Sequence, residues 1–241
     1  MKLVLIGRGR VATHLLAALQ QAGHEVVSVN SRTLAELPRQ ADAYIVAVKD
    51  SVLQEVVRQA TRDRQGQVFV HTAGSMTLSV FDGCEVRGGV LYPMQTFSKE
   101  RRVDFKEIPI FIEGSDSETV ALLRTLAESI SQSVYEMGSE QRKFLHLAAV
   151  FACNFTNHCY ALAAEVLEMQ GIPFSVMLPL IDETARKVHE LHPHDAQTGP
   201  AVRYDENVIS MQRQLLAGHP DLQEVYSLLS RSIHARSLID N

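Results

Sequence analysis

The chain has 241 residues, of which 46% are hydrophobic and 21% are charged, and its formal net charge is −5. This composition is typical of a globular protein, and the acidic balance argues against nucleic acid or an anionic membrane as a partner. The three cysteines lack a metal-type spacing, so we expect reduced thiols and a cytoplasmic location. We expect no signal peptide, and no apolar run reaches the roughly 20 residues of a membrane span.

The first predicted elements are a strand over residues 2–6 and a helix that follows it almost at once. Between them lies GRGRVA (residues 7–12), after which apolar residues recur at helical spacing. This succession is the G-x-G-x-x-A form of the dinucleotide-binding fingerprint. Gly7 permits a sharp turn, Gly9 lets a pyrophosphate approach the backbone, and Ala12 lets the helix pack closely on the strand. An ordinary strand–helix turn is the alternative. We predict that the dinucleotide is bound by Gly7, Arg8, Gly9, Arg10 and Val11.

The second predicted strand covers residues 25–30, and its last residue begins the sequence NSRT (residues 30–33). An NAD-binding fold usually carries Asp or Glu here, which holds the ribose 2′-OH and would repel a 2′-phosphate. Arg32 would attract this phosphate, and Ser31 would donate a hydroxyl hydrogen bond. We therefore predict NADP as the cofactor, with Asn30, Ser31 and Arg32 beside its adenosine ribose. The alternative is that Ser31 or Thr33 caps the next helix while Arg32 is solvated.

About a dozen residues separate this strand from the next one, which is predicted over residues 43–48. A helix around residues 34–40 fits into this space, but a helix and a further strand do not. The usual third strand is therefore expected to be missing. Because the carboxyl ends of parallel strands face the cofactor crevice, we predict that Val48, Lys49 and Asp50 border the nicotinamide ribose. A plain cap of the next helix is the alternative.

Two further strands are predicted over residues 67–70 and 90–92, and each is followed by a polar loop. Parallel strands share a direction, so both loops should open at the same edge of the sheet. We predict that Thr72 contacts the cofactor and that His71 and Gln95 contact nicotinamide or substrate. Hydrogen bonds from these residues to the backbone are the alternative.

The predicted sheet ends with strands over residues 108–113 and 134–137. Between them, Ser115 and Glu118 form a capping box for an amphipathic helix. These elements complete a first domain, which we predict to span residues 1–138.

One long helix is predicted over residues 139–170, because this segment contains no Gly or Pro. On a helical wheel, five apolar residues share one side as a packing stripe, and four polar residues share the opposite side. A polar stripe on a buried helix suits the wall of a polar pocket, because unpartnered polar groups in a core cost about 1–3 kcal/mol each. Hydrogen bonds to neighbouring helices or water are the alternative. The apolar stripe is Phe144, Leu147, Phe151, Phe155 and Leu162, and the polar stripe is Lys143, His146, Asn154 and Asn157.

The rest of the chain is predicted to be helical, with helices over residues 176–191 and 221–238. The sequence HELHPHD (residues 189–195), at the end of the first of these helices, looks metal-like, but Pro193 interrupts it and a fourth ligand is missing, so no metal site is predicted. In the loop that follows, Arg203 is predicted to bind a substrate carboxylate, with a structural ion pair as the alternative. Residues 139–241 together form the predicted substrate and dimerisation domain.

The stretches HTAGS, YPMQTFS, HLAAVFACNFTNH and TGPAVR follow GRGRVA in that order. With them the whole chain resembles a family of bacterial Rossmann-like proteins with a helical C-terminal domain, provisionally labelled NADP oxidoreductases. This family is akin to pyrroline-carboxylate reductases and to the 6-phosphogluconate and β-hydroxyacid dehydrogenases. The resemblance implies a nucleotide-binding N-terminal domain, a helical domain that usually builds a homodimer, and a catalytic cleft between the two.

The match to this family holds for some residues and fails for others. Arg10 stands where the family often has Asn. Val150 lies four residues before Asn154, where the β-hydroxyacid dehydrogenases carry a Lys, so their acid–base mechanism does not transfer directly. The matching positions are Gly7, Gly9, Ala12, Ser31, Arg32, His146, Asn154 and the Gly199-Pro200 turn.

We therefore expect an α/β fold, in which a Rossmann-type, mainly parallel sheet is followed by an all-α domain. The expected function is an NADP(H)-dependent oxidoreductase that reduces a small carbonyl or imine compound in a cleft between the domains. His146 is the expected proton donor, because imidazole exchanges protons near neutral pH; Asn154 is the second catalytic residue. Substrate contacts are expected from His71, Gln95, Asn157 and Arg203.

Two other functions differ in class from this one. A non-catalytic NADP-binding sensor or scaffold is favoured by the missing Lys and the shortened sheet. A methyltransferase that uses S-adenosylmethionine is disfavoured, because it usually needs an acidic residue at the end of the second strand. No nucleic acid or membrane partner is expected, and homodimerisation rests on the resemblance alone.

Overall fold

The computed structural model describes residues 1–238, which form two compact units that divide between Phe155 and Thr156. The first unit contains a sheet and its flanking helices, and the second contains helices. The functional boundary at residue 138, where the last strand has ended, stays a prediction.

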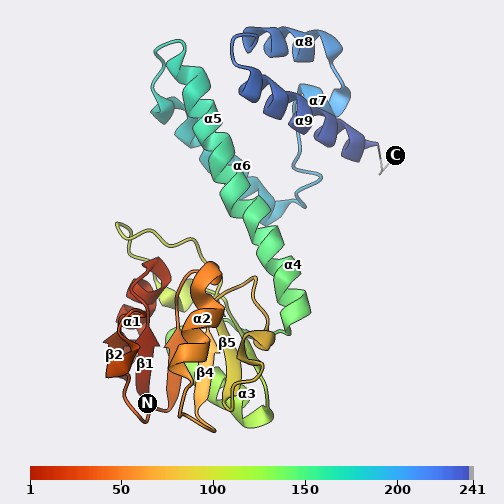
Figure 1. Ribbon diagram of the computed structural model, residues 1–241. Coiled ribbons are helices and arrows are strands. Elements are labelled where there is room, and N and C mark those ends of the chain that lie inside the picture. Colours follow the sequence, from red (N-terminus) through yellow and green to blue (C-terminus); the bar gives the residue numbers. More distant parts are fainter. Residues whose placement is uncertain (239–241) are drawn as a thin grey trace. The chain divides into compact units, whose positions relative to one another are not determined.

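The first unit is organised around a seven-stranded sheet with the order β2-β1-β3-β4-β5-β6-β7 (Figure 1). Neighbouring strands are parallel, except that β5 and β6 are antiparallel. The chain leaves β1 for β2 on one side and returns to β3 on the other, so the connections change direction at β1. This Rossmann-like arrangement confirms the predicted fold class. The strands are β1 (Lys2–Ile6), β2 (Glu25–Val29), β3 (Ala43–Val46), β4 (Val68–His71), β5 (Arg87–Pro93), β6 (Ile110–Gly114) and β7 (Val134–Glu136).

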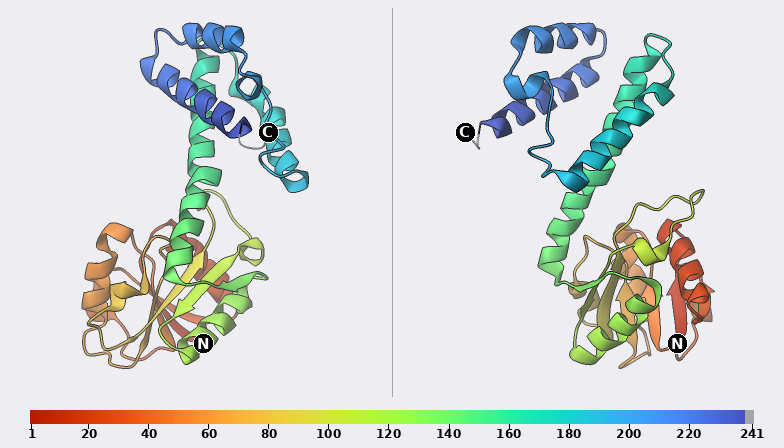
Figure 2. Two further views of the ribbon diagram at one scale, coloured as in Figure 1. Left: turned by 90° about the vertical axis from the view of Figure 1, so that its right-hand side faces the viewer. Right: turned by 180° about the vertical axis from the view of Figure 1, so that it is seen from behind.

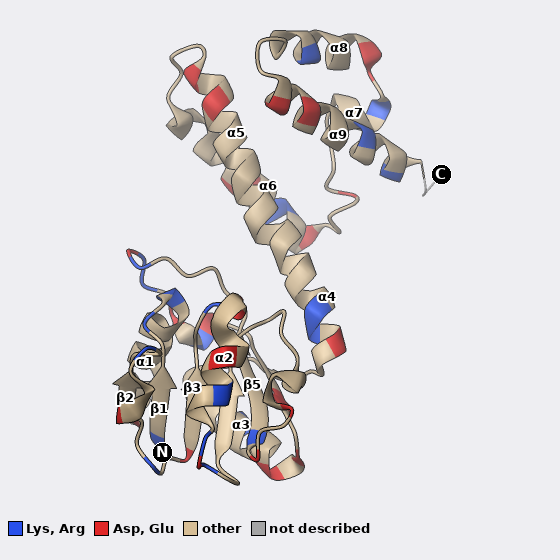
Figure 3. Ribbon diagram, in the orientation of Figure 1, with Lys and Arg blue, Asp and Glu red and all other residues tan. Residues whose placement is uncertain are grey.

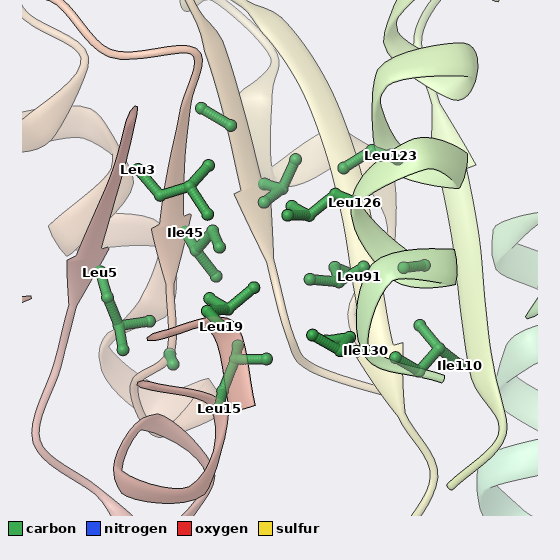
Figure 4. Packing of buried hydrophobic residues seen from close by; sticks show 14 of the residues in the cluster. Leu3, Leu5, Leu15, Leu19, Ile45, Leu91, Ile110, Leu123, Leu126 and Ile130 are labelled. Carbon is green, nitrogen blue, oxygen red and sulfur yellow. The ribbon is translucent and has the colours of Figure 1, made fainter. Parts of the chain in front are cut away.

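Helices cover both faces of this sheet (Figures 1 and 2). Successive residues of a strand point to opposite faces, so Leu3 and Leu5 of β1 face one core and Val4 and Ile6 face the other. The first core contains α1 and α3 and is shown in Figure 4, whereas α2 packs in the second core. A parallel sheet that is apolar on both faces is typical of this fold. The helices are α1 (Arg10–Gln21), α2 (Asp50–Ala60), α3 (Ser117–Ile130) and α4 (Ser139–Ala149).

The segment between β2 and β3 lacks the usual third strand, as predicted. In the described sheet β2 is an edge strand, and β3 pairs with the other side of β1. The helix predicted over residues 34–40 is wrong, because the structure has only a short 3₁₀ turn, η1 (Leu34–Glu36). Pro38 explains the difference, since proline cannot donate the backbone hydrogen bond that a longer helix needs. Its carbonyl instead accepts a hydrogen bond of 2.8 Å from the Tyr44 hydroxyl.

Helix α3 begins one residue later than the predicted capping box. Its N-cap is Asp116, whose side chain accepts a hydrogen bond of 2.9 Å from the backbone N–H of Thr119. Ser115 is therefore not the cap, and its hydroxyl donates to Asp116 instead. The guanidinium of Arg87 also bonds this carboxylate and holds the pKa of Asp116 well below its usual range. A charged carboxylate favours the helix N-terminus more than the hydroxyl of Ser115 would.

Helix α4 passes without a break into a π-helical turn, η4 (Val150–Phe155). Together with α5 (Thr156–Glu168), this confirms helical structure from Ser139 to Glu168, although a π turn changes the angle per residue that the helical wheel assumed. The predicted packing stripe is largely exposed in this chain: Phe144 is 73% exposed and Phe155 is 50% exposed. From residue 144 to residue 155 the segment carries no Lys, Arg, Asp or Glu (Figure 3).

The second unit contains the predicted tail helices. The helix predicted over residues 176–191 is α6, which is preceded by a 3₁₀ turn, and the final helix is α9. Among the described helices none is long and apolar enough to cross a membrane. Within residues 1–238, no group of three or more His, Cys, Asp or Glu side chains is placed to hold a metal ion. The elements are α5 (Thr156–Glu168), η5 (Phe174–Met177), α6 (Leu178–Glu190), α7 (Pro200–Arg203), α8 (Glu206–Leu215) and α9 (Pro220–Ser237).

Candidate functional site

The turn after β1 brings the chain against the end of β3. Gly7 has a φ of +129°, a backbone conformation that favours glycine, and a Cβ atom there would lie 2.2 Å from the carbonyl oxygen of Ala47. Gly9 has a φ of −76°, and a Cβ atom there would meet nothing within 4 Å. Gly7 is therefore required by the fold, whereas Gly9 leaves open space in front of the backbone.

Helix α1 begins directly behind this open space. Gly9 is its N-cap, no side chain caps the helix, and its first turn contains no acidic residue. The backbone N–H groups of a first helical turn have no partner within the helix and carry a partial positive charge. Ala12 is 2% exposed and lets the helix pack closely in the core. The start of α1 therefore has the geometry and the charge to receive an anion.

Four exposed cationic side chains surround the carboxyl ends of β1, β2 and β3: Arg8, Arg10, Arg32 and Lys49. None of them takes part in the ion pairs found in the described part of the chain. At the end of β2 the side chain of Asn30 accepts a hydrogen bond of 3.1 Å from the backbone N–H of Arg32. Asn30 thus shapes the turn that carries Arg32, and Ser31 is half-buried between them.

The other predicted cofactor contacts lie at the same edge of the sheet. A Cβ atom built at Gly7 would be 3.5 Å from the Val48 side chain, so Val48 lies beside the glycine turn. Thr72 follows β4 and is buried, and its backbone N–H donates a hydrogen bond of 3.3 Å to Val46. Asp50 does not cap α2 through its side chain; it accepts a hydrogen bond from the Ser75 hydroxyl.

A cleft of about 630 Å³ lies next to the glycine turn, entirely within the first unit. Its walls come from the start of α1, the end of β5 with the loop that follows, and α4 with the π turn. One cation, Arg10, lines it, and the described lining contains no Asp or Glu. The predicted residues Gln95, His146 and Asn154 are thus brought together with the glycine turn. The remaining polar or ionisable lining residues are Tyr92, Thr96 and Cys153.

His146 and Tyr92 form the best-defined polar pair of this cleft. The Tyr92 hydroxyl lies 3.1 Å from His146 Nδ1, and the two rings meet edge to face with centroids 6.0 Å apart. A Cβ atom at Gly74 would lie 2.7 Å from His146 Nδ1, so only glycine permits this approach of the loop after β4. Burial raises the pKa of Tyr92. The phenol therefore keeps its proton.

The loop after β5 is held in place at Phe97 and Ser98. Phe97 is buried in the core, and His14 Nε2 lies 2.8 Å from the carbonyl oxygen of Ser98. Gln95 is exposed, and its side-chain oxygen accepts a hydrogen bond of 2.8 Å from the backbone N–H of Thr96. This hydrogen bond fixes the orientation of the Gln95 side-chain amide.

A buried ion pair, which sequence reasoning missed, anchors α4 to the sheet. The Arg142 side chain is 1% exposed and pairs with Glu113 of β6. It also donates a hydrogen bond of 2.6 Å to the carbonyl of Met76, while the Ser139 hydroxyl donates one of 2.7 Å to Glu113. These contacts hold the first turn of α4, one turn before His146, against the loop after β4. No local signal distinguished Arg142, because the first turn of α4 (SEQR, residues 139–142) is polar throughout.

His71 lies outside the cleft lining and is fully buried. Its Nε2 donates to the carbonyl of Thr77 at 3.3 Å, and its Nδ1 accepts from the backbone N–H of Ala73 at 3.2 Å. Burial, followed by the positive charge of Arg142, lowers the pKa of His71 to about 4. This position gives no support to the predicted contact of His71 with substrate.

Two predicted substrate residues lie in the second unit. Asn157 is exposed on α5, and Arg203 is exposed at the end of α7, just before Tyr204 with its positive φ of 52°. Their contribution to the site stays a prediction. Tyr92 was missed although it is the next-to-last residue of β5, close to the kind of position from which the other strand-end residues were chosen.

The fold is that of a Rossmann-like α/β protein with a helical C-terminal region. The chain matches the model of a domain of unknown function, DUF2520, over residues 108–233, and it belongs to this family. It is also 51% identical to protein BF3122 of Bacteroides fragilis, provisionally named an NADP oxidoreductase. That likeness covers 97% of this chain and 98% of that one, with a TM-score of 0.92.

More distant solved structures share the fold. An imine reductase from Myxococcus stipitatus, in complex with NADP⁺, is 15% identical over 98% of this chain and 93% of that one, with a TM-score of 0.65. A pyrroline carboxylate reductase from Plasmodium falciparum, with NADP bound, is 11% identical over 97% and 98% of the two chains, with a TM-score of 0.61. At these identities the likeness shows the fold alone. None of the curated proteins compared with this chain matches it. These findings confirm the family resemblance drawn from the sequence.

Proposed function

We propose that this protein is an NADP(H)-dependent oxidoreductase that reduces a small carbonyl or imine compound. One observation carries the proposal: a single cleft is lined by Arg10 and Val11 of the glycine turn and by His146 and Asn154. A dinucleotide held at that turn would therefore extend toward a polar group that can give up a proton. The names of the Bacteroides, Myxococcus and Plasmodium relatives, which refer to NADP, support the choice of cofactor.

The residues at the sheet edge fit a dinucleotide with a 2′-phosphate. Gly9 leaves its backbone open, and the uncapped start of α1 suits a pyrophosphate. Arg32, with Ser31, would hold the 2′-phosphate, because an arginine fork matches the geometry of a phosphate. Val48, Lys49 and Thr72 would border the nicotinamide ribose. Arg8, Arg10, Val11 and Asn30 complete the proposed set.

A reduced nicotinamide supplies a hydride to an electrophilic carbon, and the protein contributes position and a proton. His146 would donate this proton to the substrate oxygen or nitrogen. Asn154 and Gln95 would orient the substrate by hydrogen bonds. Because the described lining carries Arg10 and no carboxylate, the cleft favours a neutral or anionic substrate over a cationic one. Asn157 and Arg203 are proposed as further substrate contacts, the latter for a carboxylate.

We also propose a cytoplasmic homodimer formed through the helical segment. The exposed aromatic side chains Phe144 and Phe155 lie on a stretch without Lys, Arg, Asp or Glu, and this kind of surface usually marks an interface. Light scattering that gives the mass of a single chain at micromolar concentration would contradict this part of the proposal.

Calorimetry and a turnover screen test the proposed function together. The full chain should bind NADPH at least about tenfold more tightly than NADH, because only NADPH presents a 2′-phosphate to Arg32. Among neutral and acidic carbonyl and imine compounds, the substrate is identified by oxidation of bound NADPH. His146→Ala should then lower kcat by about 100-fold or more while leaving NADPH affinity unchanged. The matched control His158→Ala removes an exposed histidine of α5 and should change neither quantity.

The outcomes of this test distinguish the proposed enzyme from its main rival. Absence of binding to either nucleotide would contradict the whole proposal. Tight binding of NADPH without its oxidation by any compound of the panel would instead favour a non-catalytic NADP-binding sensor. Val150, which stands where the β-hydroxyacid dehydrogenases carry a Lys, is consistent with that function.

A further inference from the structure

We propose that Tyr92 is a positioning residue that sets the tautomer of His146. In this arrangement the Tyr92 hydroxyl donates its hydrogen bond to His146 Nδ1, and the Nε2–H group is the one presented to the cleft. The proposal rests on the proposed function only in assigning the Nε2–H group, as a hydrogen-bond donor, to the reacting group of the substrate. The tautomer itself is a property of the chain alone.

The first argument is the burial of Tyr92. Tyr92 is 9% exposed, and in the described part of the chain its hydroxyl has His146 Nδ1, at 3.1 Å, as its hydrogen-bonding partner. A buried donor without an acceptor costs about 1–3 kcal/mol, so this hydroxyl is expected to donate to Nδ1. Because burial raises the pKa of Tyr92, the phenol retains the proton that it donates.

The second argument is the enclosure of one side of the imidazole. The Tyr92 ring and the backbone of Gly74 both close on Nδ1, since a Cβ atom at Gly74 would lie 2.7 Å from that nitrogen and 2.7 Å from Tyr92 Cζ. His146 nevertheless lines the cleft and is half-buried. The nitrogen on the enclosed side is thus Nδ1, and Nε2 is left as the nitrogen that a ligand in the cleft can reach.

The consequence follows from the chemistry of a neutral imidazole. One of its nitrogens carries the proton and the other accepts, so a donor fixed at Nδ1 places the proton on Nε2. Without Tyr92 the proton would distribute between the two nitrogens, and the fraction of His146 that presents an N–H hydrogen-bond donor to the cleft would fall. The sequence separation of 54 residues between Tyr92 and His146 means that folding of β5 against α4 creates this pair.

Nitrogen NMR of the full chain, labelled with ¹⁵N-histidine, measures the tautomer directly. At about pH 8.5, where an imidazole is neutral, the wild-type His146 signals should show an unprotonated Nδ1 and a protonated Nε2. Tyr92→Phe should lower the ratio of the two tautomers by about 2- to 12-fold, the equivalent of one neutral hydrogen bond of about 0.5–1.5 kcal/mol. The signals are assigned by their loss in His146→Ala.

Tyr135→Phe is the matched control for this experiment. The Phe111 ring contacts both tyrosines, with centroids 6.3 Å from Tyr92 and 5.3 Å from Tyr135, but Tyr135 is 51% exposed and its removal should leave His146 unchanged. A protonated Nδ1 in the wild type, or an unchanged ratio in Tyr92→Phe, would overturn the proposal. NADPH titration of the same samples reports on the proposed function separately, because the tautomer of the free chain does not depend on whether the cofactor binds.

Discussion

Gly7 lies so close to Ala47 that a Cβ atom at position 7 would come within 2.2 Å of the Ala47 carbonyl oxygen. This contact joins the carboxyl end of β1 to that of β3, the two strands between which the chain changes direction. Cofactors of such folds bind at this kind of switch point. The two glycines of the turn therefore have different roles: Gly7 permits the fold, and Gly9 keeps the binding surface open.

Substituting the two glycines one at a time should distinguish the effect on stability from the effect on NADPH binding. Gly7→Ala meets backbone at 2.2 Å with a φ of +129°, so it should lower the free energy of unfolding by about 3 kcal/mol or more. Gly9→Ala has room and an ordinary φ, so it should change stability by less than about 0.5 kcal/mol. It should nevertheless weaken NADPH binding by at least about tenfold, because its methyl group fills the space expected for the pyrophosphate. Urea unfolding and calorimetry measure the two effects. Normal NADPH affinity in Gly9→Ala would contradict the placement of the phosphates.

The choice between NADPH and NADH should depend on Arg32. Arg32→Ala removes a charge-assisted hydrogen bond worth about 1.5–3 kcal/mol, so NADPH should bind about 10- to 100-fold more weakly. NADH, which lacks the 2′-phosphate, should bind as before. Arg101→Ala removes an exposed arginine from another loop of the same unit and serves as the control. Equal losses of affinity for NADPH and NADH in Arg32→Ala would show that this side chain does not bind the 2′-phosphate.

The sequence predicts the parts of the fold that depend on local spacing. The glycine turn follows from its position between an apolar strand and an amphipathic helix. The missing strand follows from the short distance between residue 30 and residue 43, which leaves too little chain for two elements. The helix expected there was wrong because the constraint of Pro38 outweighed the helical spacing of its neighbours.

The pairings within the candidate site depend on tertiary structure and were beyond sequence reasoning. Tyr92 and His146 are 54 residues apart, and nothing local marks them as neighbours. Arg142 appeared to be one charge among several at the start of a helix, although its side chain is 1% exposed. His71 was chosen because it ends a strand, but the turn to Thr77 directs its ring into the core, where both nitrogens bond the backbone.

The buried pair of Arg142 and Glu113 should contribute strongly to the attachment of α4. Removing one partner leaves the other charge buried and uncompensated, which costs about 3–5 kcal/mol. Glu113→Gln and Arg142→Met should each lower the free energy of unfolding by this amount, and the double variant should lose less than the sum. The control is the exposed pair of Lys143 and Glu140 on the same helix, at 2.7 Å, which should contribute less than about 1 kcal/mol. Strictly additive losses in urea unfolding would indicate that Arg142 and Glu113 do not interact.

His71 should make the stability of the protein depend on pH. Its pKa in the folded protein is about 4, below the ordinary value of 6.5, because burial opposes the charged form. Between these values the unfolded chain binds more protons than the folded one, so stability is fully present above about pH 6.5 and falls as the pH decreases. From about pH 7.5 to 5 the loss due to His71 should be about 2 kcal/mol.

A pair of substitutions isolates the contribution of His71 from that of every other titrating group. His71→Gln retains an N–H that can donate to the Thr77 carbonyl but takes up no proton, so it should flatten the pH dependence by about 2 kcal/mol over this range. His158→Gln, on an exposed surface of α5, should keep the wild-type slope. Urea unfolding at several pH values measures both. If His71→Gln retained the wild-type slope, the ring of His71 would have to be accessible to protons in the folded protein, against its full burial and its two backbone hydrogen bonds.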